Sequence, residues 1–375
     1  MADIARLVVA WLSVALFLLF GDAWLAEPIA NAAAAVFFLW LFVSMLWSAF
    51  GAIEASDRLA EFLGEPMGSL VLTLTIIGLE GMLIAIAMLT SDFGATMGRD
   101  ALFGANMVMI NFAGGLAFFL GGLRHREQTY NFQGSSVYVA VVLVLSVIGF
   151  ILPNFTQATP RGSVTTVQAV GIIVVTLFIY FALLLIQVGR HKHFFEEVDA
   201  SAGAKVQPLG NMVAAGSDPS PEPKRGEVAK LSLLLLAGVG PVLLLAKYLT
   251  ILLDHASTKL GTPPALSGVL LALIVISPKL ISAVKAGFVN QPQRSVNLAL
   301  GSCAPAMGII FPIILGIGIV TGNAVIMGAD PSDMILLAVT LVLCAVTFSG
   351  THTTLLEGVV HLAIFAMYIV MMFSP

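Results

Sequence analysis

The chain has 375 residues, of which 59% are hydrophobic and only 10% carry a charged side chain. Soluble domains are about 25% charged, so this composition, with a mean hydropathy of +1.01, excludes a soluble globular protein. The formal net charge of -4 is too small to indicate a nucleic-acid partner. Apolar runs of roughly 20 residues recur along the whole length, and each is long enough to cross a lipid bilayer. We therefore expect an all-α polytopic membrane protein.

Eleven apolar runs follow one another along the chain, and each predicts a transmembrane helix. The first run is longer than the apolar region of a usual signal peptide and has no clear small-x-small cleavage site after it, so residues 1–24 are interpreted as a leading transmembrane helix. Residues 191–228 are rich in Pro, Gly, Ser and charges of both signs, which is typical of a solvated linker. The predicted spans cover residues 5–22, 28–51, 67–90, 100–122, 133–153, 164–189, 229–253, 266–288, 297–321, 333–350 and 353–373.

Lys and Arg residues in the loops predict the orientation, because cytoplasmic loops carry an excess of them. With the N-terminus inside, twelve Lys and Arg side chains fall on the inner side and three on the outer side. The N-terminus and the linker are therefore expected to be cytoplasmic. After an odd number of spans, the C-terminus is expected outside.

The two halves of the chain resemble each other. The string "LGEPMGSLVLTLTIIGLE" reaches Glu80, and the string "LGTPPALSGVLLALIVISPK" reaches Lys279, each after the same Leu-Gly-x-Pro opening and an apolar run. This similarity predicts a five-helix repeat over residues 25–190 and a second over residues 229–375. Because five crossings are an odd number, the second repeat must lie inverted relative to the first. Transporters built in this way bind their substrate near the middle of the membrane, where the repeats meet.

Each repeat places one charged side chain near the middle of an apolar run. An ionised side chain at the bilayer centre costs at least about 2.5–3.5 kcal/mol on insertion scales, so Glu80 and Lys279 are expected to face the interior of the bundle. Glycines beside Glu80, and Pro278 before Lys279, loosen the two helices and free backbone carbonyl groups. Thr75 and Ser277 add hydroxyl oxygens close to the two charges.

The carboxylate of Glu80 has the chemistry of an ion-exchange site. Together with carbonyl and hydroxyl oxygens it forms a hard-oxygen site that suits Na⁺, K⁺ or Ca²⁺, and a carboxylate removed from water also takes up a proton readily. Competition between proton and metal ion for Glu80 is the minimum machinery of an antiporter. The alternative is that Glu80 and Lys279 form a structural ion pair.

Other polar groups in the apolar runs support weaker hypotheses. Glu357 and His361 are four residues apart in the last span and share a helix face, so they form either a proton relay or a pair that satisfies itself. Lys247 and Asp254, toward the end of the seventh span, are expected to reach the membrane interface. The sequence contains no HExxH, GxSxG or Walker motif, so we expect neither an enzyme nor a cofactor, and transport would draw on an ion gradient. A channel remains a rival.

Several longer motifs resemble a known family. The strings "LGEPMGSLVLTLTIIGLEGMLI", "RDALFGANMVMIN", "LRHREQTYN" and "LPNFTQATPRG" in the first half, with "NQPQRSVNLALGSCAPAMG" and "LLEGVVHLAIF" in the second, are similar to the Ca²⁺/proton exchanger branch of the cation/Ca²⁺ exchanger superfamily, and to bacterial ChaA-type antiporters within it. The resemblance implies one leading helix and two inverted five-helix repeats, alternating access, and a place in the bacterial inner membrane. It assigns the acidic site of the first repeat to Glu80, a polar site in the next span to Asn111, and a small polar site of the second repeat to Ser302.

The sequence departs from this family at Lys279, where such exchangers carry a glutamate. One carboxylate facing an ammonium group suits Ca²⁺ poorly, because attraction between partners near 4 Å is of order 4 kcal/mol at an effective dielectric constant of 20. We therefore predict a cation/proton antiporter for Na⁺, K⁺ or Ca²⁺ in which Lys279 alters ion choice. Two alternatives remain: Lys279 binds an anionic solute, or transport is lost and a membrane sensor or scaffold is left.

Overall fold

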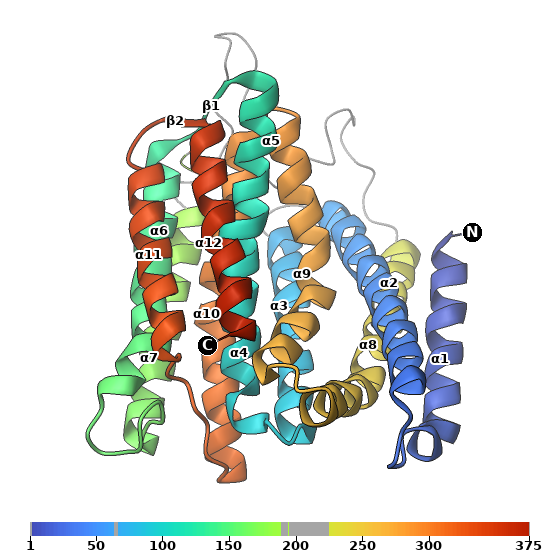
Figure 1. Cartoon of the computed structure of the whole chain (residues 1–375). Coiled ribbons are helices and arrows are strands. Elements are labelled where there is room, and N and C mark those ends of the chain that lie inside the picture. The colour runs from blue at the N-terminus through green and yellow to red at the C-terminus, as the bar shows by residue number, and fades with distance from the viewer. Residues whose placement is uncertain (1, 64–66, 189–193, 195–224, 375) are drawn as a thin grey trace. The chain divides into compact units, whose positions relative to one another are not determined.

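The computed structural model describes residues 2–63, 67–188, 194 and 225–374 (Figure 1). In this part of the chain, ten helices are long and apolar enough to cross a membrane. An eleventh apolar helix, α11 (Pro331–Thr347), has 17 residues, which is about 25 Å of helix and slightly less than the roughly 30 Å of bilayer hydrocarbon. The predicted all-α polytopic fold is confirmed. Most of the predicted linker, residues 191–228, lies outside the described residues.

The chain folds into two compact units, and each of them combines helices from both predicted repeats. The first unit comprises residues 1–101 and 213–277, and the second comprises residues 102–212 and 278–375. The first contains α1 (Ala2–Trp24), α2 (Asn31–Leu63), α3 (Met67–Thr90), the start of α4 (Gly94–Met107), α8 (Arg225–Lys259) and most of α9 (Pro264–Phe288). The second contains the π-helix η1 (Val108–Gly114), α5 (Gly115–His125), α6 (Phe132–Ser146), the π-helix η2 (Val147–Ile151), the 3-10 helix η3 (Leu152–Phe155), α7 (Thr166–Val188), α10 (Pro292–Thr321), α11 and α12 (Leu355–Phe373).

In the first unit, α2 packs along α8, and the leading helix α1 contacts both (Figure 1). Aromatic rings contribute to the contacts of α1 with α2 and α8. Phe17 on α1 is fully buried, and its ring centroid lies 5.5 Å from those of Trp24, Trp40 and Tyr248. Buried aromatic side chains contribute large apolar areas to a core, so α1 is an integral part of this unit.

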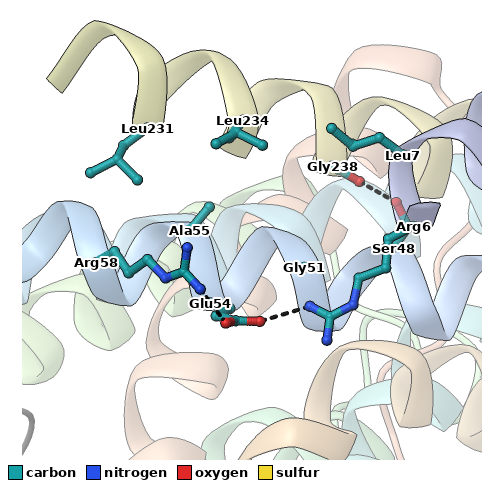
Figure 2. A pocket seen from close by; sticks show the side chains of 10 residues that line it. All are labelled: Arg6, Leu7, Ser48, Gly51, Glu54, Ala55, Arg58, Leu231, Leu234 and Gly238. Atoms are coloured by element: carbon teal, nitrogen blue, oxygen red, sulfur yellow. Dashed lines mark hydrogen bonds and ion pairs between the residues drawn. The ribbon is translucent and has the colours of Figure 1, made fainter. Parts of the chain in front are cut away.

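Helix α2 continues twelve residues beyond the predicted end at residue 51. In these added turns, Glu54 accepts a hydrogen bond from Arg58 one turn later and another from Arg6 on α1. These ion pairs favour a polar extension of the helix. A pocket lies beside them (Figure 2), lined by Arg6, Leu7, Ser48, Gly51, Glu54, Ala55, Arg58, Leu231, Leu234 and Gly238.

In the second unit, two short backbone pairings join connections that are far apart in the sequence. Strand β1 (Glu127–Thr129) pairs antiparallel with β2 (His352–Thr354), and Ser163 forms an isolated bridge with Ile326. An eleven-span chain places the two partners of each pairing on the same side of the membrane. Each pairing joins the connection after the third helix of one repeat to the connection after the fourth helix of the other repeat. The two pairings are therefore equivalent when the repeats are exchanged, as expected for inverted repeats.

Helices α5 and α12 of the second unit approach each other closely (Figure 1). A Cβ atom added at Gly358 on α12 would lie 2.3 Å from the backbone nitrogen of Phe119 and 2.7 Å from the carbonyl oxygen of Gly115 on α5. Small residues allow such approaches between membrane helices. The contact brings the following turn of α12, which carries His361, against α5.

Candidate functional site

Glu80 lies near the middle of α3, in the first unit. Its side chain is 2% exposed, and neighbouring Leu79 and Leu83 are equally buried. Thr75 is half-buried on the same helix. The structure therefore gives Glu80 the buried, mid-helix position that an exchange site in a membrane needs.

Lys279 and Ser277 lie on α9, on either side of the internal Pro278. Ser277 belongs to the first unit and Lys279 to the second; both side chains are half-buried. The Ser277 hydroxyl donates a hydrogen bond to the carbonyl oxygen of Leu273, one turn earlier on its own helix. Bonding of this kind is common for hydroxyl side chains in helices.

Asn111 is the centre of a buried polar cluster in the second unit. It lies on the π-helix η1 and is fully buried; π-helical turns are frequent at functional sites. Its amide nitrogen donates to the hydroxyl of Thr340 at 2.9 Å and to the sulfur of Met107 at 3.3 Å. Its amide oxygen lies 2.9 Å from Nδ1 of His361. Asn111 and His361, named separately by the sequence, therefore meet.

The other predicted site residues of the second unit take separate roles. Glu357 closes the first turn of α12 in a capping box, in which its carboxylate accepts a hydrogen bond from the Thr354 backbone nitrogen at 2.9 Å. It shares a helix face with His361, whose Nδ1 is engaged with Asn111. Ser302 on α10 is half-buried, and its hydroxyl lies 3.4 Å from the carbonyl oxygen of Ala299.

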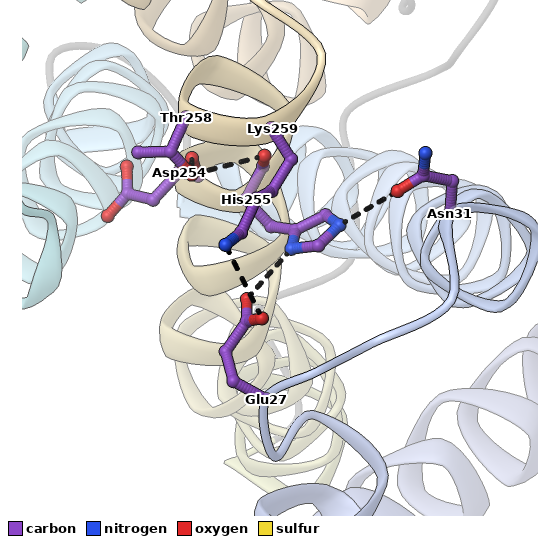
Figure 3. Close-up of polar contacts among 6 residues, drawn as sticks. All are labelled: Glu27, Asn31, Asp254, His255, Thr258 and Lys259. Atoms are coloured by element: carbon purple, nitrogen blue, oxygen red, sulfur yellow. Dashed lines mark hydrogen bonds and ion pairs between the residues drawn. The ribbon is translucent and has the colours of Figure 1, made fainter.

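The end of α8 carries two buried polar residues whose partners the sequence did not indicate. Asp254 is only 7% exposed and accepts hydrogen bonds from the Ser91 hydroxyl at 2.8 Å and the Asp92 backbone nitrogen at 2.9 Å, in the connection after α3. Burial is possible because these donors compensate its charge. His255 turns toward the connection between α1 and α2, where it meets Glu27 (Figure 3). The Lys247 side chain, on the same helix, is 51% exposed.

Comparisons with known proteins agree with this architecture. The model of the sodium/calcium exchanger protein family matches residues 33–189 and 230–374. The chain is 33% identical over 329 residues to a putative ionic transporter, y4hA, of Sinorhizobium fredii, covering 87% of this chain and 85% of that protein. It is 31% identical over 332 residues to the sodium-potassium/proton antiporter ChaA of Escherichia coli, covering 88% and 87%.

The solved structure of YfkE, a Ca²⁺/H⁺ antiporter, shares the fold. The two structures superpose with a TM-score of 0.72 at 16% sequence identity, covering 99% of this chain and 100% of that one. The family model matches most of the chain, and two relatives above 30% identity cover most of it as well. The chain therefore belongs to the sodium/calcium exchanger protein family.

Proposed function

We propose that this chain is a secondary active cation/proton antiporter that works by alternating access, with Glu80 as the carboxylate that protons and cations share. The observation that carries the proposal is the 2% exposure of Glu80 near the middle of a membrane-spanning helix. The Escherichia coli relative and YfkE are both cation/proton antiporters, which supports the same reaction.

Coupling follows from the chemistry of a single buried carboxylate. The ionised form is unfavourable in an apolar interior unless a positive charge neutralises it, and either a proton or a metal cation does so. Because one carboxylate does not hold both at once, release of one ion accompanies binding of the other. Within the first unit, Thr75 and Ser277 are proposed to add the hydroxyl oxygens that hard cations prefer. Asn111 and Ser302 are proposed to offer amide and hydroxyl oxygens to the transported cation in the second unit.

Lys279 is proposed to shift ion choice toward the monovalent cations Na⁺ and K⁺. Lys279 puts an ammonium group where such exchangers carry a glutamate, so a divalent cation would meet one carboxylate instead of two. The Escherichia coli relative is named for sodium and potassium, which is consistent with this preference.

The proposed orientation places the N-terminus in the cytoplasm and the C-terminus outside, in the inner membrane of a bacterium. It rests on the excess of Lys and Arg in the predicted inner loops. The inward proton gradient across that membrane would drive cations out of the cell in exchange for protons, whichever way the chain is oriented.

Proton release from everted membrane vesicles tests the proposed function. Vesicles from a host that lacks its own cation/proton antiporters are acidified inside by respiration, and Na⁺, K⁺ or Ca²⁺ is then added separately. The chain is expected to release protons on addition of at least one cation, more strongly for Na⁺ or K⁺ than for Ca²⁺. Vesicles without the chain are the control, and equal responses from both would contradict the proposal.

A further inference from the structure

We propose that His361 is a positioning residue for the transported cation. Its Nδ1–H group holds the side-chain amide of Asn111 in one orientation. In this orientation the NH₂ group points to Thr340 and Met107, and the amide oxygen keeps a lone pair for the cation. This inference rests on the proposed cation exchange, and it adds a specific role for the last helix of the chain.

The thioether of Met107 fixes which way the amide of Asn111 lies. Sulfur in a methionine only accepts hydrogen bonds, so the amide group 3.3 Å from it must be the NH₂ group. The Thr340 hydroxyl directs its own hydrogen to the same sulfur, at 3.8 Å, and therefore accepts from Asn111 at 2.9 Å. The amide oxygen is thereby left facing His361.

The amide oxygen in turn fixes the hydrogen on the imidazole ring. An amide oxygen only accepts hydrogen bonds, so Nδ1 of His361, 2.9 Å away, must carry a hydrogen. Nε2 lies 3.4 Å from the hydroxyl of Thr347 and accepts that hydrogen when the ring is neutral. A protonated ring also carries a hydrogen on Nδ1, so the orienting hydrogen bond does not depend on the charge of His361.

The surrounding helices hold the imidazole in place. His361 is 1% exposed, and its Cβ lies 3.0 Å from the position that a Cβ on Gly115 would take. The ring of Phe118 lies with its centroid 6.4 Å from that of the imidazole. The close contact between α5 and α12 therefore fixes the donor, and the donor fixes the amide.

Loss of this donor would remove the preference for one amide orientation. The oxygen and nitrogen of an asparagine side chain are nearly the same size, so the amide can turn over without a steric penalty. A reversed Asn111 would present hydrogen atoms to a cation instead of lone pairs. The affinity for the cation should fall, while the rate of exchange at saturating cation should change much less.

Three substitutions of His361 test this role in everted vesicles, with proton release measured at increasing concentrations of Na⁺, K⁺ and Ca²⁺. Asparagine places an NH₂ group close to the position of Nδ1, glutamine places it nearer to Nε2, and leucine has no donor. We expect His361→Leu and His361→Gln to raise the half-saturating cation concentration about fivefold or more. His361→Asn should keep it within about twofold of the native value, although asparagine does not carry protons. His352→Leu, at an exposed histidine of β2, is the matched control and should have no effect.

A second measurement separates this inference from the proposed function. The cations are added to the purified proteins, and the shift of the thermal unfolding temperature is recorded. The native chain and His361→Asn should be stabilised at lower cation concentrations than His361→Leu. Failure of His361→Asn to restore affinity, or native affinity in His361→Leu, would overturn the positioning role even if the native chain exchanges ions. A native chain with neither exchange nor a cation-dependent shift overturns both proposals.

Discussion

Nδ1 of His255 on α8 lies 2.9 Å from Oε1 of Glu27, in the connection between α1 and α2 (Figure 3). The other ring nitrogen lies 3.4 Å from the Asn31 side chain, and the Lys259 ammonium group lies 3.9 Å from the second oxygen of Glu27. This cluster attaches one end of the leading helix to α8. The ion pair between Arg6 and Glu54, at 2.7 Å, attaches the other end to α2.

Removal of the Glu27 carboxylate should make the stability of the protein less sensitive to acid. The hydrogen bond with His255, and the charge of Lys259, lower the pKa of Glu27 below its usual value. A carboxylate with a lowered pKa stabilises the fold above its unfolded pKa of about 4.3, and this contribution is lost as the pH falls through the folded value. The difference in unfolding temperature between the native chain and Glu27→Gln should therefore be full at about pH 6 and close toward pH 3.

Thermal unfolding in detergent across that pH range checks this prediction. Glu61→Gln, at an exposed position of α2, is the control and should follow the native profile. A constant difference between native and Glu27→Gln at every pH would show that the cluster does not stabilise the charged carboxylate.

Asp254→Ala should lower stability by about 1–3 kcal/mol, because the Ser91 hydroxyl and the Asp92 backbone nitrogen lose their acceptor. Asp254→Asn should cost less, since its amide oxygen still accepts one hydrogen bond. Asp22→Ala is a suitable control: Asp22 is 83% exposed and lies 3.7 Å from Lys247, and exposed ion pairs contribute about 0–1 kcal/mol. Equal losses for Asp254→Ala and Asp22→Ala in thermal unfolding would argue against the buried role of Asp254.

Gly358→Ala should force α5 and α12 apart, because the new Cβ would overlap the backbone of Phe119. Overpacking of a close contact costs about 1–3 kcal/mol, so a lower unfolding temperature is expected. Gly171→Ala on α7 is the matched control, since no described atom lies within 4 Å of its added Cβ. It should be neutral or slightly stabilising. The prediction fails if the two alanine variants unfold at the same temperature.

Lys279→Glu should increase Ca²⁺-driven proton release relative to release driven by Na⁺ or K⁺. The substitution replaces an ammonium group by a second carboxylate, and divalent cations favour sites with more negative charge. Initial rates in everted vesicles at matched protein levels give the comparison. Lys285→Glu, further along the same helix, controls for charge alone. An unchanged ratio of Ca²⁺ to monovalent activity in Lys279→Glu would remove Lys279 from the account of ion choice.

The helices themselves were largely predictable from the sequence, because a bilayer requires apolar runs of fixed minimum length. The predicted span at residues 67–90 agrees with α3, Met67–Thr90. The end of α2 was not predictable in this way. Its last turns are polar, and the ion pair of Glu54 with Arg6 joins residues 48 positions apart.

The buried polar contacts were harder to predict for the same reason. A charge or amide in an apolar run shows that a partner is needed, but it does not name the partner. Asn111 bonds to Thr340, 229 positions away, and to His361, 250 positions away. Thr340 is a single hydroxyl in an apolar run, which gives no signal of its own, since such hydroxyls commonly bond to their own helix.

Cation-driven proton release by the Glu80→Gln variant tests the central claim most directly. Glutamine keeps the size of the side chain but neither ionises nor exchanges a proton, and Glu227→Gln, at an exposed position near the start of α8, controls for the loss of one carboxylate. At equal amounts in everted vesicles, Glu80→Gln should release no protons on addition of Na⁺, K⁺ or Ca²⁺, whereas Glu227→Gln should match the native chain. Native rates of release by Glu80→Gln would contradict the account.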